Sequence, residues 1–109
     1  MAELEDGQAT AIAITTGRDP DGTPVLRVSG QLDISNASTL EDALMKAAEA
    51  KPRTIVFDLA ELEFMDSAGI SVLVRARSEV GEVRLRNPSP IVRRLIEITG
   101  LAEILPSDP

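Results

Sequence analysis

A polar corner, Asp66-Ser67-Ala68-Gly69, offers the clearest candidate chemistry in the chain. It separates an apolar, strand-like run from an apolar, helix-like run. A serine in this position stands where a helix begins, and there free backbone N–H groups and the positive end of the helix dipole point outward. Its hydroxyl can cap the helix, act as a nucleophile or accept a phosphoryl group.

The composition argues against most catalytic alternatives. The 109 residues include no Cys and no His, so the chain lacks a thiol nucleophile, thiolate metal ligands, the commonest general base and a Ser-His-Asp triad. Phosphate-binding loops and dinucleotide fingerprints are missing as well, because the glycines stand apart from one another. We therefore expect no enzymatic activity, no metal and no cofactor.

Two acidic features can be interpreted either as functional sites or as ordinary structural carboxylates. Asp58, near the end of a strand, suits phosphoaspartate receiver chemistry, but that chemistry needs a divalent cation held by further carboxylates. The first strand ends in Thr15-Thr16-Gly17 and supplies none, so we expect Asp58 to hydrogen-bond the loop after it. Glu61, Glu63 and Asp66 suggest a metal cluster, but nothing in their spacing makes them converge.

The charge and hydropathy of the chain indicate which classes of partner it can bind. The chain carries 18 acidic and 11 basic residues, a net charge of −7, which repels nucleic acid and anionic lipid and is compatible with a protein partner. It has no apolar run of about 18 residues, and its acidic N-terminus lacks the features of a signal peptide. We expect a cytoplasmic protein that binds neither nucleic acid nor membrane.

Apolar periodicity predicts the order β-β-α-β-α-β-α plus a short terminal helix, in one domain over residues 1–109 with a core at about 10–105. The predicted strands are 11–15, 25–29, 54–59 and 82–86; the predicted helices are 37–50, 68–79 and one from Pro90, with a final turn at 102–105. The Pro20-Asp21-Gly22 turn joins the first two strands into an antiparallel hairpin. A hairpin followed by β-α units implies an α/β fold with a mixed four-stranded sheet.

Local signals predict the helix starts. Ser38 with Glu41 fits a capping box for the first helix, although Ser35 or Asn36 can also cap it. Ser89 is predicted to cap the last helix.

The remaining expectations concern loops and one helix face. Residues 30–36 and 60–65 are predicted to connect elements. In the last helix, the side chains expected to face inward are Ile91, Leu95 and Ile98.

On the residues alone, Ser67 keeps two interpretations, and spacing favours the first. In the first, Asp66 or Ser67 caps the helix. In the second, Ser67 accepts a phosphoryl group from a partner kinase, which adds about −1.5 to −2 charges at neutral pH. The helix N-terminus tolerates that charge, but a partner pressed against the corner does not. Gly69 either keeps the first turn slim for an approaching surface or packs the helix closely on the sheet.

The motifs together resemble the STAS-domain anti-sigma factor antagonists (anti-anti-sigma factors) of bacteria. Met65-Asp66-Ser67-Ala68-Gly69 is similar to the family's Met-Asp-Ser-Ser/Thr-Gly, and Gly30-Gln31-Leu32-Asp33 is similar to its Gly-Glu-Leu-Asp. The similarity extends from about Thr10 to Leu105. Further matching stretches are Phe57-Asp58-Leu59, Asn87-Pro88-Ser89-Pro90, Leu95 and Thr99-Gly100-Leu101.

The resemblance implies a non-enzymatic, STAS-like regulator, which we expect to be a monomer or weak dimer. Unphosphorylated antagonists of this family bind an anti-sigma factor that is also a serine kinase, and binding frees the sigma factor. The kinase then phosphorylates the corner serine with ATP, the complex separates, and a PP2C-type phosphatase resets the switch. By resemblance, Ser67 is the phosphoacceptor and Asp33 the loop acid that helps dock the kinase. The implied partner-binding residues are Asp33, Ser35, Asp66, Ala68, Gly69 and Ser71.

Three departures from the family pattern stand out. Ala68 replaces the usual Ser or Thr, Ser71 replaces a residue that is often Gly, and the segment 75–82 is shorter than is common. An alternative function is a STAS scaffold subunit of a stressosome-like or transporter assembly, without a phosphorylation switch.

Overall fold

Strands and helices alternate after an initial hairpin. The computed structural model describes residues 12–107, so the predicted strand start at Ala11 lies outside the described residues. The elements are β1 (Ile12–Arg18), β2 (Pro24–Leu32), α2 (Ala37–Ala48), β3 (Thr54–Met65), α3 (Ser67–Val80), β4 (Glu82–Arg86) and α4 (Pro90–Ile98). This order confirms the predicted α/β fold.

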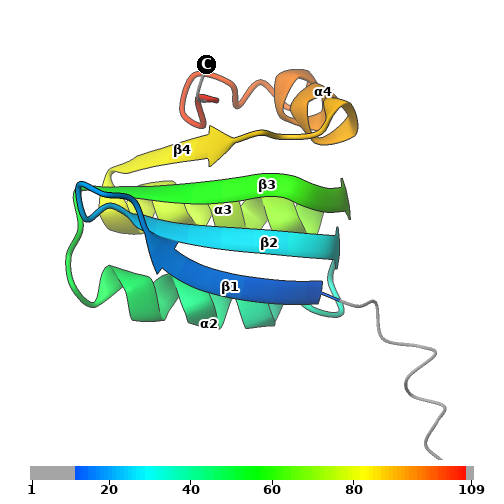
Figure 1. Ribbon diagram of the computed structural model, residues 1–109. Coiled ribbons are helices and arrows are strands. Elements are labelled where there is room, and N and C mark those ends of the chain that lie inside the picture. The colour runs from blue at the N-terminus through cyan, green and yellow to red at the C-terminus, as the bar shows by residue number, and fades with distance from the viewer. Residues whose placement is uncertain (1–11, 108–109) are drawn as a thin grey trace, which may run out of the picture.

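The sheet is mixed, as predicted. Its strand order is β1-β2-β3-β4 (Figure 1), with β1 antiparallel to β2 and the other neighbours parallel. The hairpin turn closes through a backbone bond of 2.9 Å from Asp19 N–H to the Thr23 carbonyl, and the Asp21 carboxylate accepts from Thr23 N–H at 3.0 Å. The turn residues therefore act as their composition indicates.

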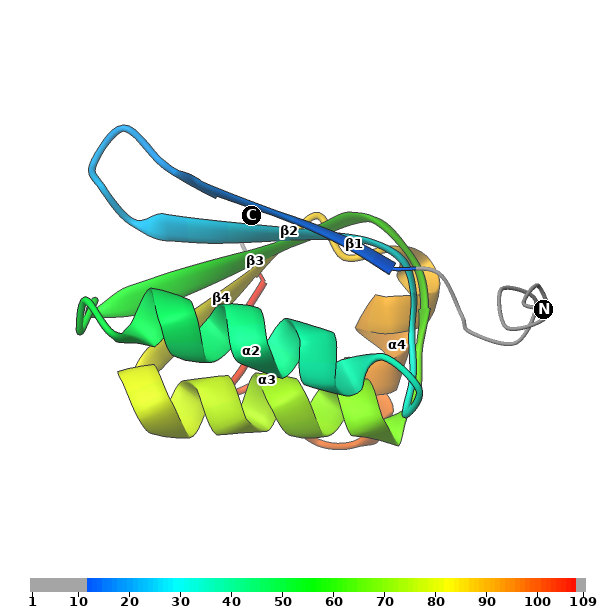
Figure 2. The same cartoon turned by 90° about the horizontal axis from the view of Figure 1, so that it is seen from below.

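The helices α2 and α3 lie side by side on one face of the sheet, and α4 lies at the end of the domain where β2 and β3 finish (Figure 2). The core between these layers is aliphatic except for the fully buried Phe57. Truncating such a side chain to alanine typically costs about 3–5 kcal/mol. The residues that fill this layer include Leu26, Val28, Leu40, Leu44, Ile55, Leu73, Ala76, Val83 and Leu85.

Two segments predicted as loops instead continue the sheet. Residues 30–32 extend β2, and residues 60–65 extend β3 as far as Met65. The pairing shifts register between Arg27 and Ser29 and again between Gly30 and Gln31, and Gly30 has a φ of 96°. A bulge breaks the alternation of inward and outward side chains, so the sequence loses the two-residue period that marks a strand.

The predicted inward face of α4 is wrong at two positions. Val92 and Ile96 are the buried residues, whereas Ile91 is 60% and Ile98 68% exposed, and Leu95 is half-buried. The five apolar side chains share one arc of the helix that is wider than the contact with the domain. The period therefore identifies the arc but not which part of it is covered.

The C-terminal segment adds an edge contact in place of the predicted short helix. Residues 102–104 form only a turn, in which Leu105 N–H donates to the Leu101 carbonyl at 2.9 Å. Leu85 N–H then donates to the Pro106 carbonyl at 2.9 Å, and Ser107 forms a parallel bridge with Leu85. Pro106 and Ser107 thus cover part of the β4 edge.

The helix caps agree with one prediction and correct another. Ser89 caps α4, since its hydroxyl accepts from Val92 N–H at 3.3 Å. The capping box at Ser38 and Glu41 is wrong, because α2 begins after Asn36 and Ser38 lies inside the helix. The Asn36 side chain makes no cap bond and is used in the preceding loop.

The sheet face opposite α2 and α3 carries ion pairs. Arg27 contacts Asp58 at 3.4 Å, and Asp58 also accepts from Ala60 N–H at 3.1 Å, as predicted for that carboxylate. Arg86 on β4 makes two bonds, of 3.0 and 2.9 Å, to the Asp19 carboxylate in the hairpin turn. This hydrogen bonding lowers the pKa of Asp19. The link ties the hairpin turn to the far edge of the sheet.

Candidate functional site

Asp66, rather than Ser67, caps helix α3. Its side-chain oxygen accepts from Ala68 N–H at 2.8 Å and from Gly69 N–H at 3.4 Å. Its backbone carbonyl accepts the first intrahelical bond, from Ile70 N–H at 3.2 Å. The side-chain bonds satisfy two of the backbone donors that every helix start leaves free. The capping role that the sequence left open between Asp66 and Ser67 therefore belongs to Asp66.

Ser67 is the first residue of α3, and its side chain is exposed. Within residues 12–107 its hydroxyl has no hydrogen-bond partner; only its backbone carbonyl is engaged, by the Ser71 hydroxyl at 3.0 Å. The positive end of the helix dipole lies at this position and favours a negative group there. The hydroxyl is therefore free to react or to contact a partner.

Strand register brings the Asp33 loop beside this corner. Leu32 pairs with Met65 at the ends of the parallel strands β2 and β3. One residue beyond Met65, Asp66 N–H donates to the carbonyl of the same Leu32 at 3.1 Å. The loop 33–36 and the corner 66–69 therefore leave the same edge of the sheet together, at the end that also holds α4 (Figure 1).

The Asp33 loop is held by its own side chains. The Asp33 carboxylate accepts from Ser35 N–H at 2.9 Å and from the Ser35 hydroxyl at 2.6 Å. Asn36, only 7% exposed, accepts from Asp33 N–H at 3.0 Å and donates to the Gln31 carbonyl at 2.8 Å. These bonds order Asp33 and Ser35 before any partner arrives, which lowers the entropy cost of docking.

The remaining predicted partner residues differ in exposure. Ser71 is exposed and Ala68 half-buried, whereas Gly69 is buried. A Cβ on Gly69 would stand 2.5 Å from Met65 Cγ and 2.8 Å from Leu32 Cδ2. Of its two predicted roles, the geometry supports close packing of helix on sheet. Gly69 supports the corner from beneath rather than facing outward.

The sequence alone does not predict two exposed apolar side chains near the corner. Ile34 is 83% exposed between Asp33 and Ser35, and Phe64 is 46% exposed two residues before the cap of α3. Large apolar groups at a polar corner favour contact with another protein. The signal present in the sequence is a large apolar residue, Ile34, between the polar residues Asp33 and Ser35.

The sequence also does not predict that the Asn36 side chain holds the loop together. The type and position of this residue predict only a helix cap, whereas its two loop bonds depend on how the chain turns between Gln31 and Asn36. No pattern in the sequence shows that turn.

Other kinds of site find little support in the described part of the chain. Among residues 12–107, no three acidic side chains lie close enough together to hold a metal ion, so Glu61, Glu63 and Asp66 do not converge there. None of the helices in that range is long and apolar enough to cross a bilayer. The exposed hydroxyl and its ordered surroundings therefore remain the best candidate site.

Comparison with known proteins places these features in context. The family model described as the STAS domain matches residues 16–109. The anti-sigma-B factor antagonist of Listeria monocytogenes is 34% identical over 92 residues, which cover 81% of this chain and 80% of the relative.

Two solved structures share the fold. The crystal structure of an anti-sigma factor antagonist from Mycobacterium paratuberculosis gives a TM-score of 0.82 at 31% identity, covering 91% of this chain and 86% of that one. The anti-sigma factor antagonist SpoIIAA, in its unphosphorylated form, gives a TM-score of 0.75 at 25% identity, covering 89% of each chain.

Proposed function

The chain belongs to the STAS-domain family of anti-sigma factor antagonists, and from that membership we propose that it binds an anti-sigma factor, releases a sigma factor and is switched off by phosphorylation of Ser67. The partner acts as the serine kinase, and this chain is substrate and ligand rather than enzyme. The observation that carries the proposal is that helix capping and the exposed hydroxyl belong to two different residues of the corner. Asp66 caps α3, and the Ser67 hydroxyl is left exposed.

The chemistry at Ser67 is phosphoryl transfer. The Oγ atom attacks the γ-phosphorus of ATP held by the kinase, the bond to the bridging β–γ oxygen breaks, and ADP leaves. The hydroxyl proton passes to a base of the kinase, as this type of transfer requires. Ser67 needs only to be reachable and correctly placed, which its exposed position on the first turn of α3 provides.

The phosphate acts as a charge switch. It adds about −1.5 to −2 charges at neutral pH, directly beside the Asp66 carboxylate on the chain. The surroundings also include the exposed apolar side chains of Ile34 and Phe64. A partner that covers this surface excludes water from it, and burying an uncompensated dianion is costly. Phosphorylation therefore separates the complex, and a PP2C-type phosphatase in the cytoplasm restores the binding form.

The description of one solved relative supports a role for phosphorylation in this switch. The SpoIIAA structure is that of an unphosphorylated form, so the phosphorylation state is a variable of that protein.

The test uses the cognate anti-sigma factor, ATP and intact-mass spectrometry. The parent chain is expected to gain one phosphate, and Ser67→Ala none. Ser78→Ala, which removes an exposed serine near the C-terminal end of α3, is the matched control and is expected to gain one phosphate. Phosphate on the Ser67→Ala variant would overturn the assignment.

Calorimetry tests the switch itself. Ser67→Ala is expected to bind the anti-sigma factor as tightly as the parent, and Ser67→Asp more weakly by at least about tenfold, which is 1.4 kcal/mol. Equal affinities for both variants would exclude a charge switch. They would favour the phosphorylation-insensitive scaffold instead.

A further inference from the structure

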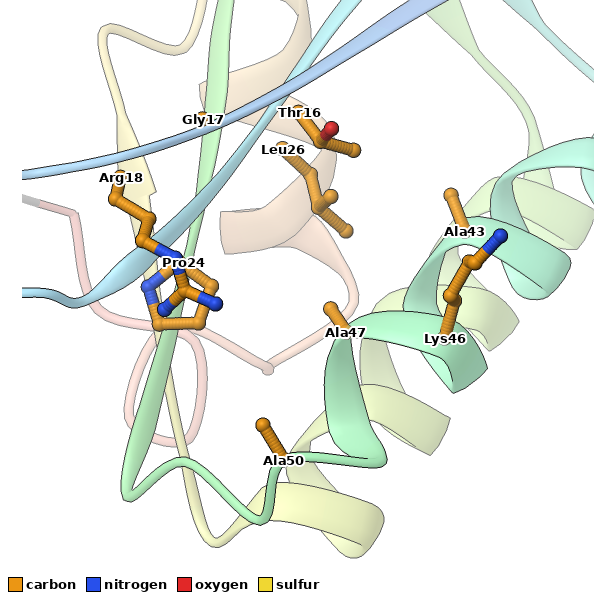
Figure 3. A pocket seen from close by; sticks show the side chains of 9 residues that line it. All are labelled: Thr16, Gly17, Arg18, Pro24, Leu26, Ala43, Lys46, Ala47 and Ala50. Atoms are coloured by element: carbon orange, nitrogen blue, oxygen red, sulfur yellow. The ribbon is translucent and has the colours of Figure 1, made fainter.

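A cavity of about 400 Å³ lies between the β1–β2 hairpin and helix α2. Figure 3 shows the side chains that line it, from both strands of the hairpin and from the C-terminal half of α2. Its volume falls within the range of about 300–1,000 Å³ that is usual for small-molecule sites. Its lining residues come from the hairpin end of β1 and β2 and from the C-terminal end of α2. In Figure 2 these ends lie opposite the start of α3, where Ser67 is the first residue.

Small residues on both walls leave the space open. On α2 the wall includes Ala43 and Ala47, continued by Ala50 just beyond the helix. On β1 the wall includes Gly17, where an added Cβ would meet no atom within 4 Å. The buried Leu26 of β2 lines the same space. The result is a largely apolar cavity with an open mouth.

Two cations line the cavity, Arg18 on the hairpin and Lys46 on α2, and their charged groups point in different directions (Figure 3). The lining includes no acidic residue. Within residues 12–107 neither cation forms an ion pair with a carboxylate. Arg18 uses one N–H on the Gly22 carbonyl at 2.9 Å and keeps further donors. On a chain with a net charge of −7, this is a local preference for anions.

We propose that this cavity binds a small amphipathic carboxylate, such as a medium-chain fatty acid anion. The alkyl chain lies against Leu26, Ala43 and Ala47, and burial of that apolar surface supplies the affinity. The carboxylate lies against Arg18, where charge-assisted hydrogen bonds to the guanidinium orient it, and Lys46 adds positive charge to the same lining. This site is separate from the Ser67 corner and does not depend on the function proposed above.

The test is a titration of the full chain, labelled with nitrogen-15, with sodium octanoate, followed by amide chemical shifts. Saturable shifts are expected at Gly17, Ala43 and Ala47 and not at Ser67. For a ligand of about ten non-hydrogen atoms, a Kd of about 1 mM is expected. Heptyltrimethylammonium, with the same alkyl tail and the opposite charge, is expected to bind at least about tenfold more weakly.

Matched variants separate filling of the cavity from loss of charge. Ala47→Leu fills the cavity and is expected to abolish saturable binding; Ala50→Leu fills its mouth at a more exposed position and serves if the first variant does not fold. Arg18→Gln combined with Lys46→Gln is expected to weaken octanoate binding about tenfold. Arg93→Gln on α4 removes an exposed cation far from the cavity and is expected to change nothing.

Three results would overturn the proposal. The first is the absence of saturable shifts at Gly17, Ala43 and Ala47 in the parent chain. The second is unchanged binding in a folded variant that fills the cavity. The third is equal affinity for octanoate and the cationic analogue.

Discussion

Gly69 lies so close to Leu32 that no side chain fits between them. A Cβ on Gly69 would stand 2.8 Å from Leu32 Cδ2, below the 3.0 Å limit that real Cβ contacts respect. Leu32 is the last residue of β2, directly before Asp33, and Gly69 is the third residue of α3, two after Ser67. This contact therefore sets the separation between the two halves of the proposed docking surface.

Gly69→Val is expected to destabilise the protein. At an uncrowded helix position the loss of glycine is favourable, but overpacking a filled site costs about 1–3 kcal/mol, and valine adds more volume than the site accepts. Urea unfolding measures the difference. Gly17→Ala is the control, because an added Cβ there meets nothing, and it is expected to leave the midpoint nearly unchanged. Equal midpoints for Gly69→Val and the parent would contradict the packing role.

Helix capping is assigned to Asp66 and phosphate acceptance to Ser67. The stability of variants at the two positions tests this assignment. Asp66→Ala removes the acceptor for Ala68 N–H and Gly69 N–H and is expected to cost about 1 kcal/mol. Asp66→Asn keeps a capping oxygen and is expected to retain most of that stability. Ser67→Ala removes no cap and is expected to be close to neutral in thermal or urea unfolding. A larger loss for Ser67→Ala than for Asp66→Ala would reverse the assignment.

Local chemistry explains which parts of the fold the sequence predicts. The Pro20-Asp21-Gly22 turn and the Ser89 cap work through neighbouring residues, and both have the structure their types imply. The polar corner is in the predicted place for the same reason, since a cap needs only the next three residues. Element order and the start of α3 follow from such signals.

What the sequence does not predict depends on contacts between distant segments. Whether Ile98 is covered depends on how α4 packs against the rest of the domain, not on helical period. The full length of β3 depends on bulges in β2 around Gly30. The exposure of Ile34 and the loop bonds of Asn36 depend on how that loop closes. The features of this loop are the ones that complete the candidate site.

Ile34→Ala and Phe64→Ala are expected to weaken binding of the anti-sigma factor without lowering stability. Both side chains are exposed beside the corner, and a few apolar anchors usually carry most of the binding energy of an interface. A loss of more than about 1 kcal/mol, or roughly fivefold in Kd, is expected for at least one of them. Calorimetry measures the affinity and urea unfolding the stability.

Ile98→Ala on α4 is the comparison for these two variants, because Ile98 is 68% exposed but is not part of the corner. Its affinity is expected to match that of the parent. If Ile34→Ala and Phe64→Ala bind as tightly as Ile98→Ala, the apolar groups at the corner do not contact the partner.

The Asp19–Arg86 link predicts a pH-dependent contribution to stability. Hydrogen bonding to Arg86 holds the pKa of Asp19 below its usual 3.8 in the folded protein. Because the folded pKa is the lower one, the link stabilises the fold above about pH 4 and loses its effect as the pH falls through the folded pKa. Asp19→Asn is therefore expected to be less stable than the parent at pH 7, with the difference shrinking towards pH 2. Asp42→Asn, an exposed acid on α2, controls for the loss of one negative charge and is expected to show no such trend. Urea midpoints measured across this range decide the matter, since a difference that persists unchanged at pH 2 would mean that the ion pair is not its source.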